Sequence, residues 1–158
     1  MKNSGALKVT AQSDREIVMT RVFDAPRSLV FDAYTKPELL KRWLGDGREM
    51  GVRGVYREVV RPERLVNTEK FDDAWYPGES LITATFVEQG GKTTLTATMR
   101  YESTEARDAV IKSPMESGVA KSYDKLAELL ASGGGARGES GHERDAYALS
   151  EVIRRFRL

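Results

Sequence analysis

The feature that most constrains this chain is a strict alternation of apolar and polar residues between positions 93 and 101. The apolar set is Leu95, Ala97, Met99 and Tyr101, and the polar set between them is Thr94, Thr96, Thr98 and Arg100. A period of two places these sets on opposite faces of a β-strand. The apolar stretch from Leu81 to Val87 lies just before it, across Gln89-Gly90-Gly91, which predicts an antiparallel hairpin. One face of the resulting sheet must be covered.

A long helix near residue 115 is the predicted cover. Ser113-Pro114-Met115-Glu116 has the spacing of a capping box, with proline suited to the first helical turn. Apolar residues then recur at helical spacing as far as Ala131, and three glycines from Gly133 end the pattern. Because an amphipathic helix needs an apolar surface to pack against, we expect it to lie across the sheet.

The remaining segments predict three more strands and two short helices. The expected order is strand Glu16 to Phe23, a helix from Pro26 to Tyr34, a helix from Pro37 to Leu44, strand Glu49 to Val60 and strand Arg64 to Phe71. Residues 1–14 are expected to be a flexible leader, residues 15–131 the domain, and residues 132–158 a flexible tail with a possible short amphipathic helix. The predicted fold class is α+β, with one antiparallel sheet of about five strands.

Composition excludes several function classes. The 158 residues include no cysteine, so disulfides, thiolate metal sites and a cysteine nucleophile are impossible. Lys and Arg number 25 against 24 Asp and Glu, so the chain lacks the strong positive field of a nucleic-acid-binding protein. No run of 18 apolar residues predicts a membrane span, and no targeting segment is evident, so a cytoplasmic location is expected.

The motifs that could carry chemistry have ordinary structural interpretations. The one histidine, His142, lies in the predicted tail, which disfavours a zinc site, a Ser-His-Asp triad and a histidine base in the domain. Gly45-x-Gly47-x-x-x-Gly51 follows a helix and precedes a strand, the reverse of a dinucleotide-binding turn. Asp72-Asp73 fits a solvated turn. No catalytic residue, metal or cofactor is predicted.

Aromatic side chains supply the more useful signal. They are spread over the helices and strands that would surround one interior, and most are expected to be core. A helix lying across a curved sheet can nevertheless leave a concave apolar gap, which is a common geometry for a small-molecule site. The candidate lining residues are Trp43, Phe86, Leu95, Met99, Tyr101, Met115, Val119 and Tyr123.

This order of elements resembles the helix-grip fold of the START-like (SRPBCC) superfamily. Four stretches of the chain are similar to the branch related to the C-terminal domain of the activator of heat-shock protein 90 ATPase. They are IVMTRVFDAPRSLVFDAYTKPELLKRWL, GVYREVVRPERLVNTEKFDD, WYPGESLITATFVEQGGKTTLTATMRY and MESGVAKSYDKLAELL. The resemblance covers roughly residues 15 to 131. It implies a fold that binds a ligand or a partner.

One departure from that family is large. The family pattern has a hairpin after its second helix, whereas Leu44 here reaches the strand Glu49 to Val60 through only Gly45-Asp46-Gly47. Two of the family's seven strands are therefore expected to be missing. The groove would lose a wall, and Glu49 to Val60 would become an exposed edge able to pair with a second copy or another protein.

The preferred hypothesis is a non-catalytic module that binds a small hydrophobic or amphipathic molecule between the long helix and the sheet. The alternative is a protein-interaction module, similar to a chaperone ATPase activator, acting through the exposed edge. A START-like enzyme is a third possibility, disfavoured because the domain holds no histidine or cysteine. A weakly folded remnant is a fourth.

Overall fold

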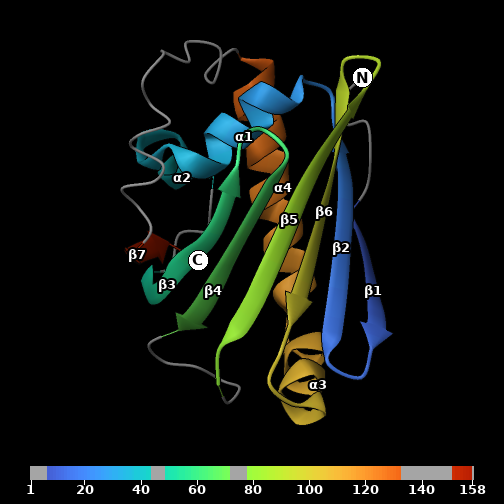
Figure 1. Ribbon diagram of the computed structural model, residues 1–158, viewed down its shortest axis with the longest axis vertical. Coiled ribbons are helices and arrows are strands. Elements are labelled where there is room, and N and C mark those ends of the chain that lie inside the picture. Colours follow the sequence, from blue (N-terminus) through green and yellow to red (C-terminus); the bar gives the residue numbers. More distant parts are fainter. Residues whose placement is uncertain (1–6, 44–48, 72–77, 133–150, 158) are drawn as a thin grey trace.

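The computed structural model describes residues 7–43, 49–71, 78–132 and 151–157, and Figure 1 shows its helices gathered on one side of a curved sheet. The elements follow the expected order, with an added strand at each end of the chain. They are β1 (Lys8–Ser13), β2 (Glu16–Phe23), α1 (Arg27–Thr35), α2 (Pro37–Trp43), β3 (Glu49–Val60), β4 (Arg64–Phe71), β5 (Ser80–Gln89), β6 (Lys92–Arg100), α3 (Thr104–Lys112), α4 (Met115–Ala131) and β7 (Glu151–Arg157).

The sheet has the strand order β1-β2-β6-β5-β4-β3-β7, and all neighbours are antiparallel. The five strands predicted from sequence are β2 to β6, and the two short helices follow β2 as expected. The α+β helix-grip fold is therefore confirmed. None of the helices in the described part of the chain is long and apolar enough to cross a membrane.

Alternation along each strand explains the position of the helices. On β6, Leu95, Ala97 and Met99 are buried, whereas the threonines between them are only half-buried. The cross-strand pairs Leu95 with Phe86 and Ala97 with Ala84 place β5 in the same register. The apolar side chains line the concave face of the sheet, and α1, α2 and α4 pack over that face (Figure 1).

The prediction that residues 1–14 form a flexible leader is wrong for Lys8–Ser13. Lys8–Ser13 forms β1, which pairs with β2 through Val9 opposite Met19. Val9 and Leu7 pack against buried residues of the sheet, so this polar segment carries enough apolar surface to dock. Without β1, the outer edge of β2 would present unpaired backbone groups.

The tail also differs from its prediction. Glu151–Arg157 is a strand and not a short helix, and it pairs antiparallel with β3 from Glu49 opposite Arg157 to Val55 opposite Glu151. The edge that the shortened link after α2 was expected to expose is therefore paired, over that stretch, by the chain itself. The cause is the same as for β1, because an unpaired strand edge gains backbone hydrogen bonds when a further strand is added.

The buried apolar residues form two clusters on the concave side. The larger one lies under α1, α2 and the C-terminal half of α4, and we call it the closed end; its buried members include Phe23, Phe31, Trp43, Leu65, Phe86, Leu95, Tyr123 and Leu126. The smaller one lies near α3 and contains Ile17, Met19, Met99, Tyr101, Ala106 and Val110.

Candidate functional site

The eight residues predicted to line a pocket fall into both clusters. Four belong to the closed end, namely Trp43, Phe86, Leu95 and Tyr123. Met99 and Tyr101 belong to the smaller cluster, and Met115 packs against it. Val119 is half-buried on α4 and packs against both clusters. All eight therefore belong to or pack against the two buried clusters, and Val119 marks the position between them.

The aromatic residues of the closed end pack tightly on one another. The centre of the Tyr34 ring lies 4.9 Å from the centre of the Trp43 ring and 5.5 Å from the centre of the Phe86 ring. Trp43 is 1% exposed, and its indole Nε1 donates a hydrogen bond to the carbonyl of Ala33 at 3.0 Å. Such a side chain is part of the core, so the inner candidates lie at the floor of the candidate site and are not themselves accessible.

A pair of tyrosine hydroxyls bridges α1 and α4 at this floor. The Tyr34 and Tyr123 hydroxyl oxygens are 2.9 Å apart. Burial raises the pKa of Tyr34 well above its ordinary value and also raises the pKa of Tyr123, and the carboxylate of Glu69 adds to both shifts. Because the pair uses only one of its two hydrogens, the second can be donated to a further acceptor.

Burial along β4 shows where the concave face opens. Leu65 is buried in the closed end, whereas Asn67 and Glu69, at the next two positions on the same face, are half-buried. Tyr56 pairs with Asn67 from β3 and is also half-buried. We call Tyr56, Asn67 and Glu69 the polar wall. Tyr56 packs against the closed end, to which Tyr123 belongs and against which Tyr34 also packs.

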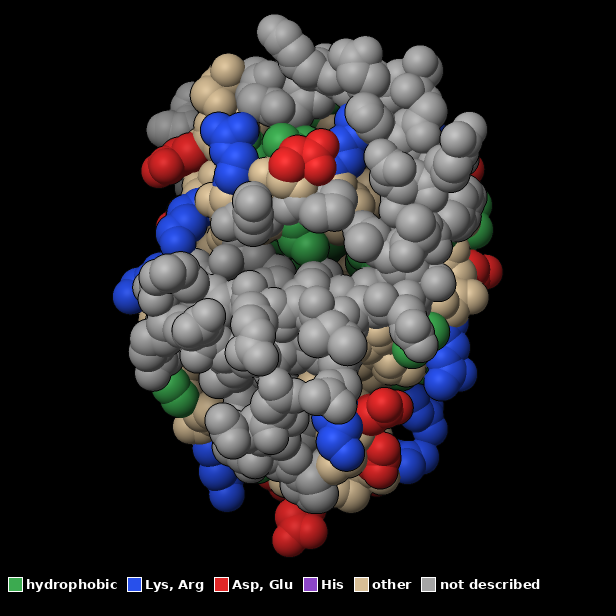
Figure 2. Space-filling view, turned by 90° about the vertical axis from the view of Figure 1, so that its left-hand side faces the viewer, with side chains coloured by type: hydrophobic (Ala, Val, Ile, Leu, Met, Phe, Trp, Pro, Cys, Tyr) green, Lys and Arg blue, Asp and Glu red, His purple; other side chains and the backbone are tan. Residues whose placement is uncertain are grey.

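A hollow is visible on this side of the molecule. Figure 2 looks onto the side on which α2 and β3 lie, and hydrophobic side chains are seen at the bottom of a hollow near its middle. A different depression, of about 360 Å³, lies beside the β1–β2 turn and is lined by Ser13, Asp14, Arg15 and Arg100. None of the eight predicted residues lines that depression, so it is not the predicted site.

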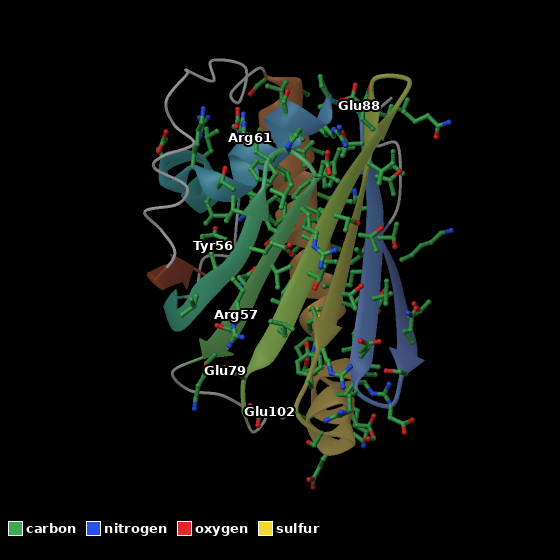
Figure 3. The ribbon with its side chains drawn as sticks, viewed as in Figure 1. Tyr56, Arg57, Arg61, Glu79, Glu88 and Glu102 are labelled. Carbon is green, nitrogen blue, oxygen red and sulfur yellow. The ribbon has the colours of Figure 1, made fainter. Side chains whose placement is uncertain are left out.

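A buried charge cluster ties α1 to the turn between β3 and β4, and Figure 3 shows Arg61 of that turn close to α1. Asp32 Oδ1 lies 2.7 Å from Arg61 Nη1, and Asp32 Oδ2 lies 3.6 Å from Lys36 Nζ. The guanidinium of Arg61 also lies 5.4 Å from the centre of the Phe31 ring. Residues two positions apart on a helix point in nearly opposite directions, so Asp32 faces away from Tyr34.

The polar wall and Tyr34 were missed by the sequence analysis. The faces of β4 could not be assigned from sequence, because Arg64–Phe71 mixes apolar and polar residues without a clean period. One signal was present in the sequence. Leu65, Asn67 and Glu69 are every second residue of the strand and so lie on one face, which changes from apolar to polar along its length. Among the described residues, no group of three or more His, Asp or Glu side chains could hold a metal ion.

Comparison with solved structures supports the fold. A crystal structure from Rhodobacter sphaeroides is 25% identical, with a TM-score of 0.74, and covers 80% of this chain and 99% of its own. A solution structure from Staphylococcus epidermidis is 25% identical, with a TM-score of 0.65, and covers 85% of this chain and 98% of its own. A crystal structure from Mycobacterium smegmatis, 21% identical with a TM-score of 0.66, covers 79% and 97% and shares the fold.

Comparison with family models assigns the chain. No curated protein matches it. The model described as Activator of Hsp90 ATPase homolog 1-like protein matches residues 24–131, which span α1 to the end of α4. This is the branch that the sequence resembled, and the match covers more than half of the chain. The chain therefore belongs to the family of activator of Hsp90 ATPase homolog 1-like proteins.

Proposed function

We propose that this domain binds a small amphipathic molecule in the groove between α4 and the polar wall. The observation that carries the proposal is the change of burial along the concave face. Leu65 and Ala84 are buried, whereas Asn67 and Ile82, which are the next pair along β4 and β5 on that face, are only half-buried. An apolar floor with a few polar groups on its rim is the usual construction of a ligand site.

The tyrosine pair supports an amphipathic ligand over a purely apolar one. A buried O–H donor is best satisfied by an acceptor, and leaving such a group unpaired costs about 1 to 3 kcal/mol. A ligand with an alkyl or aromatic body and an oxygen-bearing end would pack on Val119 and accept from Tyr34 or Tyr123. The alternative of a protein partner at the β3 edge has lost its main support, because β7 pairs there.

Thermal unfolding with a panel of neutral amphiphiles tests the proposal. A ligand present at a hundred times its Kd stabilises the folded state by about 2.7 kcal/mol, which raises Tm by several degrees. Val119→Trp should fill the groove and abolish this shift. Val87→Trp, on the convex face, is the matched control, because Val87 is 58% exposed there, and it should retain the shift. Equal shifts in both variants would place binding elsewhere, and no shift with any ligand would contradict the proposal.

A further inference from the structure

The buried hydrogen-bond donors around the closed end differ in whether their hydrogens are used. The indole N–H of Trp43 and the hydroxyls of Thr35 and Thr93 each donate to a backbone carbonyl, at 3.0 Å, 2.9 Å and 2.6 Å. Among the described residues, the hydroxyls of Tyr34 and Tyr123 have each other as partners, so two hydrogens share one hydrogen bond. The second hydrogen of this pair is therefore available to a further acceptor.

Packing fixes both tyrosine rings before any ligand arrives. The centre of the Tyr123 ring lies 5.6 Å from that of Phe23 and 6.1 Å from that of Trp43, and Tyr34 packs on Trp43 from the other helix. Burial is the largest cause that raises the pKa of each tyrosine, so both phenols keep their hydrogens at neutral pH. A donor held in place in this way loses little conformational freedom when a ligand binds.

Exposure distinguishes the two hydroxyls. Tyr123 is 5% exposed, whereas Tyr34 is half-buried. Tyr123 also lies one helical turn after Val119 on the same face of α4, which places the pair next to the apolar lining of the proposed groove. A ligand in that groove would accept from Tyr34, and Tyr34 would accept from Tyr123. A hydroxyl that accepts a hydrogen bond becomes a stronger donor, so Tyr123 supports Tyr34 without touching the ligand.

We infer that the groove selects a neutral molecule whose polar end is a carbonyl oxygen, as in a ketone, aldehyde or ester, with Tyr34 as the donor and Tyr123 as its positioning residue. The inference rests on the proposed function. A carbonyl oxygen accepts the one available hydrogen and brings none of its own, whereas a hydroxyl end brings a hydrogen that needs a further acceptor. A charged end would lose its hydration shell in exchange for at most one hydrogen bond from the pair.

The test compares hexanophenone with the alkene in which a methylene group replaces its carbonyl oxygen. Isothermal titration calorimetry at neutral pH gives both Kd values for the full chain. Tyr34→Phe should weaken the ketone about tenfold and leave the alkene within about twofold, because only the ketone uses the hydroxyl. Tyr123→Phe should weaken the ketone about two- to threefold, because Tyr34 still donates but loses its support. Retained alkene binding also shows that each variant is folded.

Carbon-13 spectra of hexanophenone labelled at the carbonyl carbon give a readout that packing alone would not move. A hydrogen bond draws electron density from the carbonyl carbon, so the bound resonance should lie further downfield in wild type than in Tyr34→Phe. Tyr123→Phe should give an intermediate position. Thr35→Val is the matched control, because it removes a neighbouring hydroxyl of α1 that donates within its own helix. It should leave both affinities within about twofold and the resonance in place.

The possible failures are distinguishable. Equal weakening of ketone and alkene in Tyr34→Phe, or ketone binding that Tyr34→Phe leaves unchanged, would overturn the carbonyl selection while leaving the groove as a binding site. A larger loss in Tyr123→Phe than in Tyr34→Phe would overturn the assignment of Tyr34 as the donor. Failure of both ligands to bind the wild-type chain would overturn the proposed function together with the inference.

Discussion

The two parts of the concave face contrast in burial and chemistry. The closed end is packed with aromatic rings, and its members Trp43 and Phe86 are each 1% exposed. The polar wall, on β3 and β4, keeps Tyr56, Asn67 and Glu69 half-buried on the same side of the sheet. The comparison teaches that burial is uneven along one face: the closed end holds the helices on the sheet, and the wall is where the proposed function places a ligand. Substitutions can separate the two.

The largest expected effect is the loss of the Trp43 ring. Trp43→Ala removes a side chain that contacts Tyr34 and Tyr123 and leaves a cavity at the closed end. Substitutions of this kind cost about 3 to 5 kcal/mol of unfolding free energy. Urea denaturation followed by far-ultraviolet circular dichroism measures the change. Val87→Ala, at an exposed position, should cost under about 0.5 kcal/mol, and similar losses in both variants would contradict the assignment of Trp43 to the core.

The next largest effect is expected at the buried charge cluster. Asp32→Asn leaves Lys36, whose side chain is 8% exposed, and Arg61 without their shared counter-charge. Breaking a buried pair in this way costs about 3 to 5 kcal/mol, and because Arg61 is 32% exposed we expect a value of about 2 to 4 kcal/mol. Arg64→Gln is the control, because its partner Glu58 is exposed, and it should cost at most about 1 kcal/mol. The urea denaturation midpoints of the two variants measure these losses of unfolding free energy.

A smaller effect is expected at the tyrosine pair. Tyr34→Phe removes one hydrogen bond to Tyr123, which is worth about 1 kcal/mol of unfolding free energy. The pH dependence gives a second readout. Both pKa values are raised in the folded protein, so above about pH 10 the folded chain keeps protons that the unfolded chain has lost, and stability falls as pH rises.

The variant should reduce that alkaline loss, because one of the two shifted groups is gone. Each group contributes at most about 1.4 kcal/mol per pH unit above its ordinary pKa. Urea midpoints between pH 8 and pH 11 for wild type and Tyr34→Phe measure the difference in slope. Parallel curves for the two proteins would show that the Tyr34 hydroxyl is not buried in the way described.

The smallest effect on stability is expected at the sheet edge, where the readout is association. Ending the chain before Glu151 removes β7 and exposes the backbone of β3 from Glu49 to Val55. An unpaired edge of this length can pair with a second copy. Light scattering over a range of concentrations should show self-association of the shortened chain, with the full chain as its control. A shortened chain that stays monomeric would contradict the role of β7 in covering this edge.

The parts of the fold that could be predicted from sequence were those in which apolar residues recur with a clear period. Strict alternation identified β6, and the stripe from Met115 to Leu130 identified α4. The terminal strands were missed for two different reasons: β1 is mostly polar, although it forms a hairpin with the strand that follows it directly, and β7 joins a strand about a hundred residues away in sequence. Local propensity carries no information on either contact.

The candidate site stays a prediction, and the sequence analysis named only its apolar and aromatic residues. The eight residues chosen by aromatic and apolar character proved to belong to, or pack against, the buried clusters. The polar groups near the proposed site, Tyr34 and Glu69, could not be placed from sequence, because their position depends on how β4 faces α1 and α4, which a mixed strand pattern does not determine. Polar residues on a predicted core face were the signal that could have identified them.

The most direct test of the account is a chemical-shift map of ligand binding. A titration of isotope-labelled protein with decanol, followed by two-dimensional amide spectra, reports which backbone positions sense the ligand. The account predicts that the largest shifts occur at Tyr56, Asn67, Glu69 and Val119. Shifts confined to the convex face, at Thr94, Thr96 and Thr98, would contradict it, as would a well-dispersed spectrum that does not change.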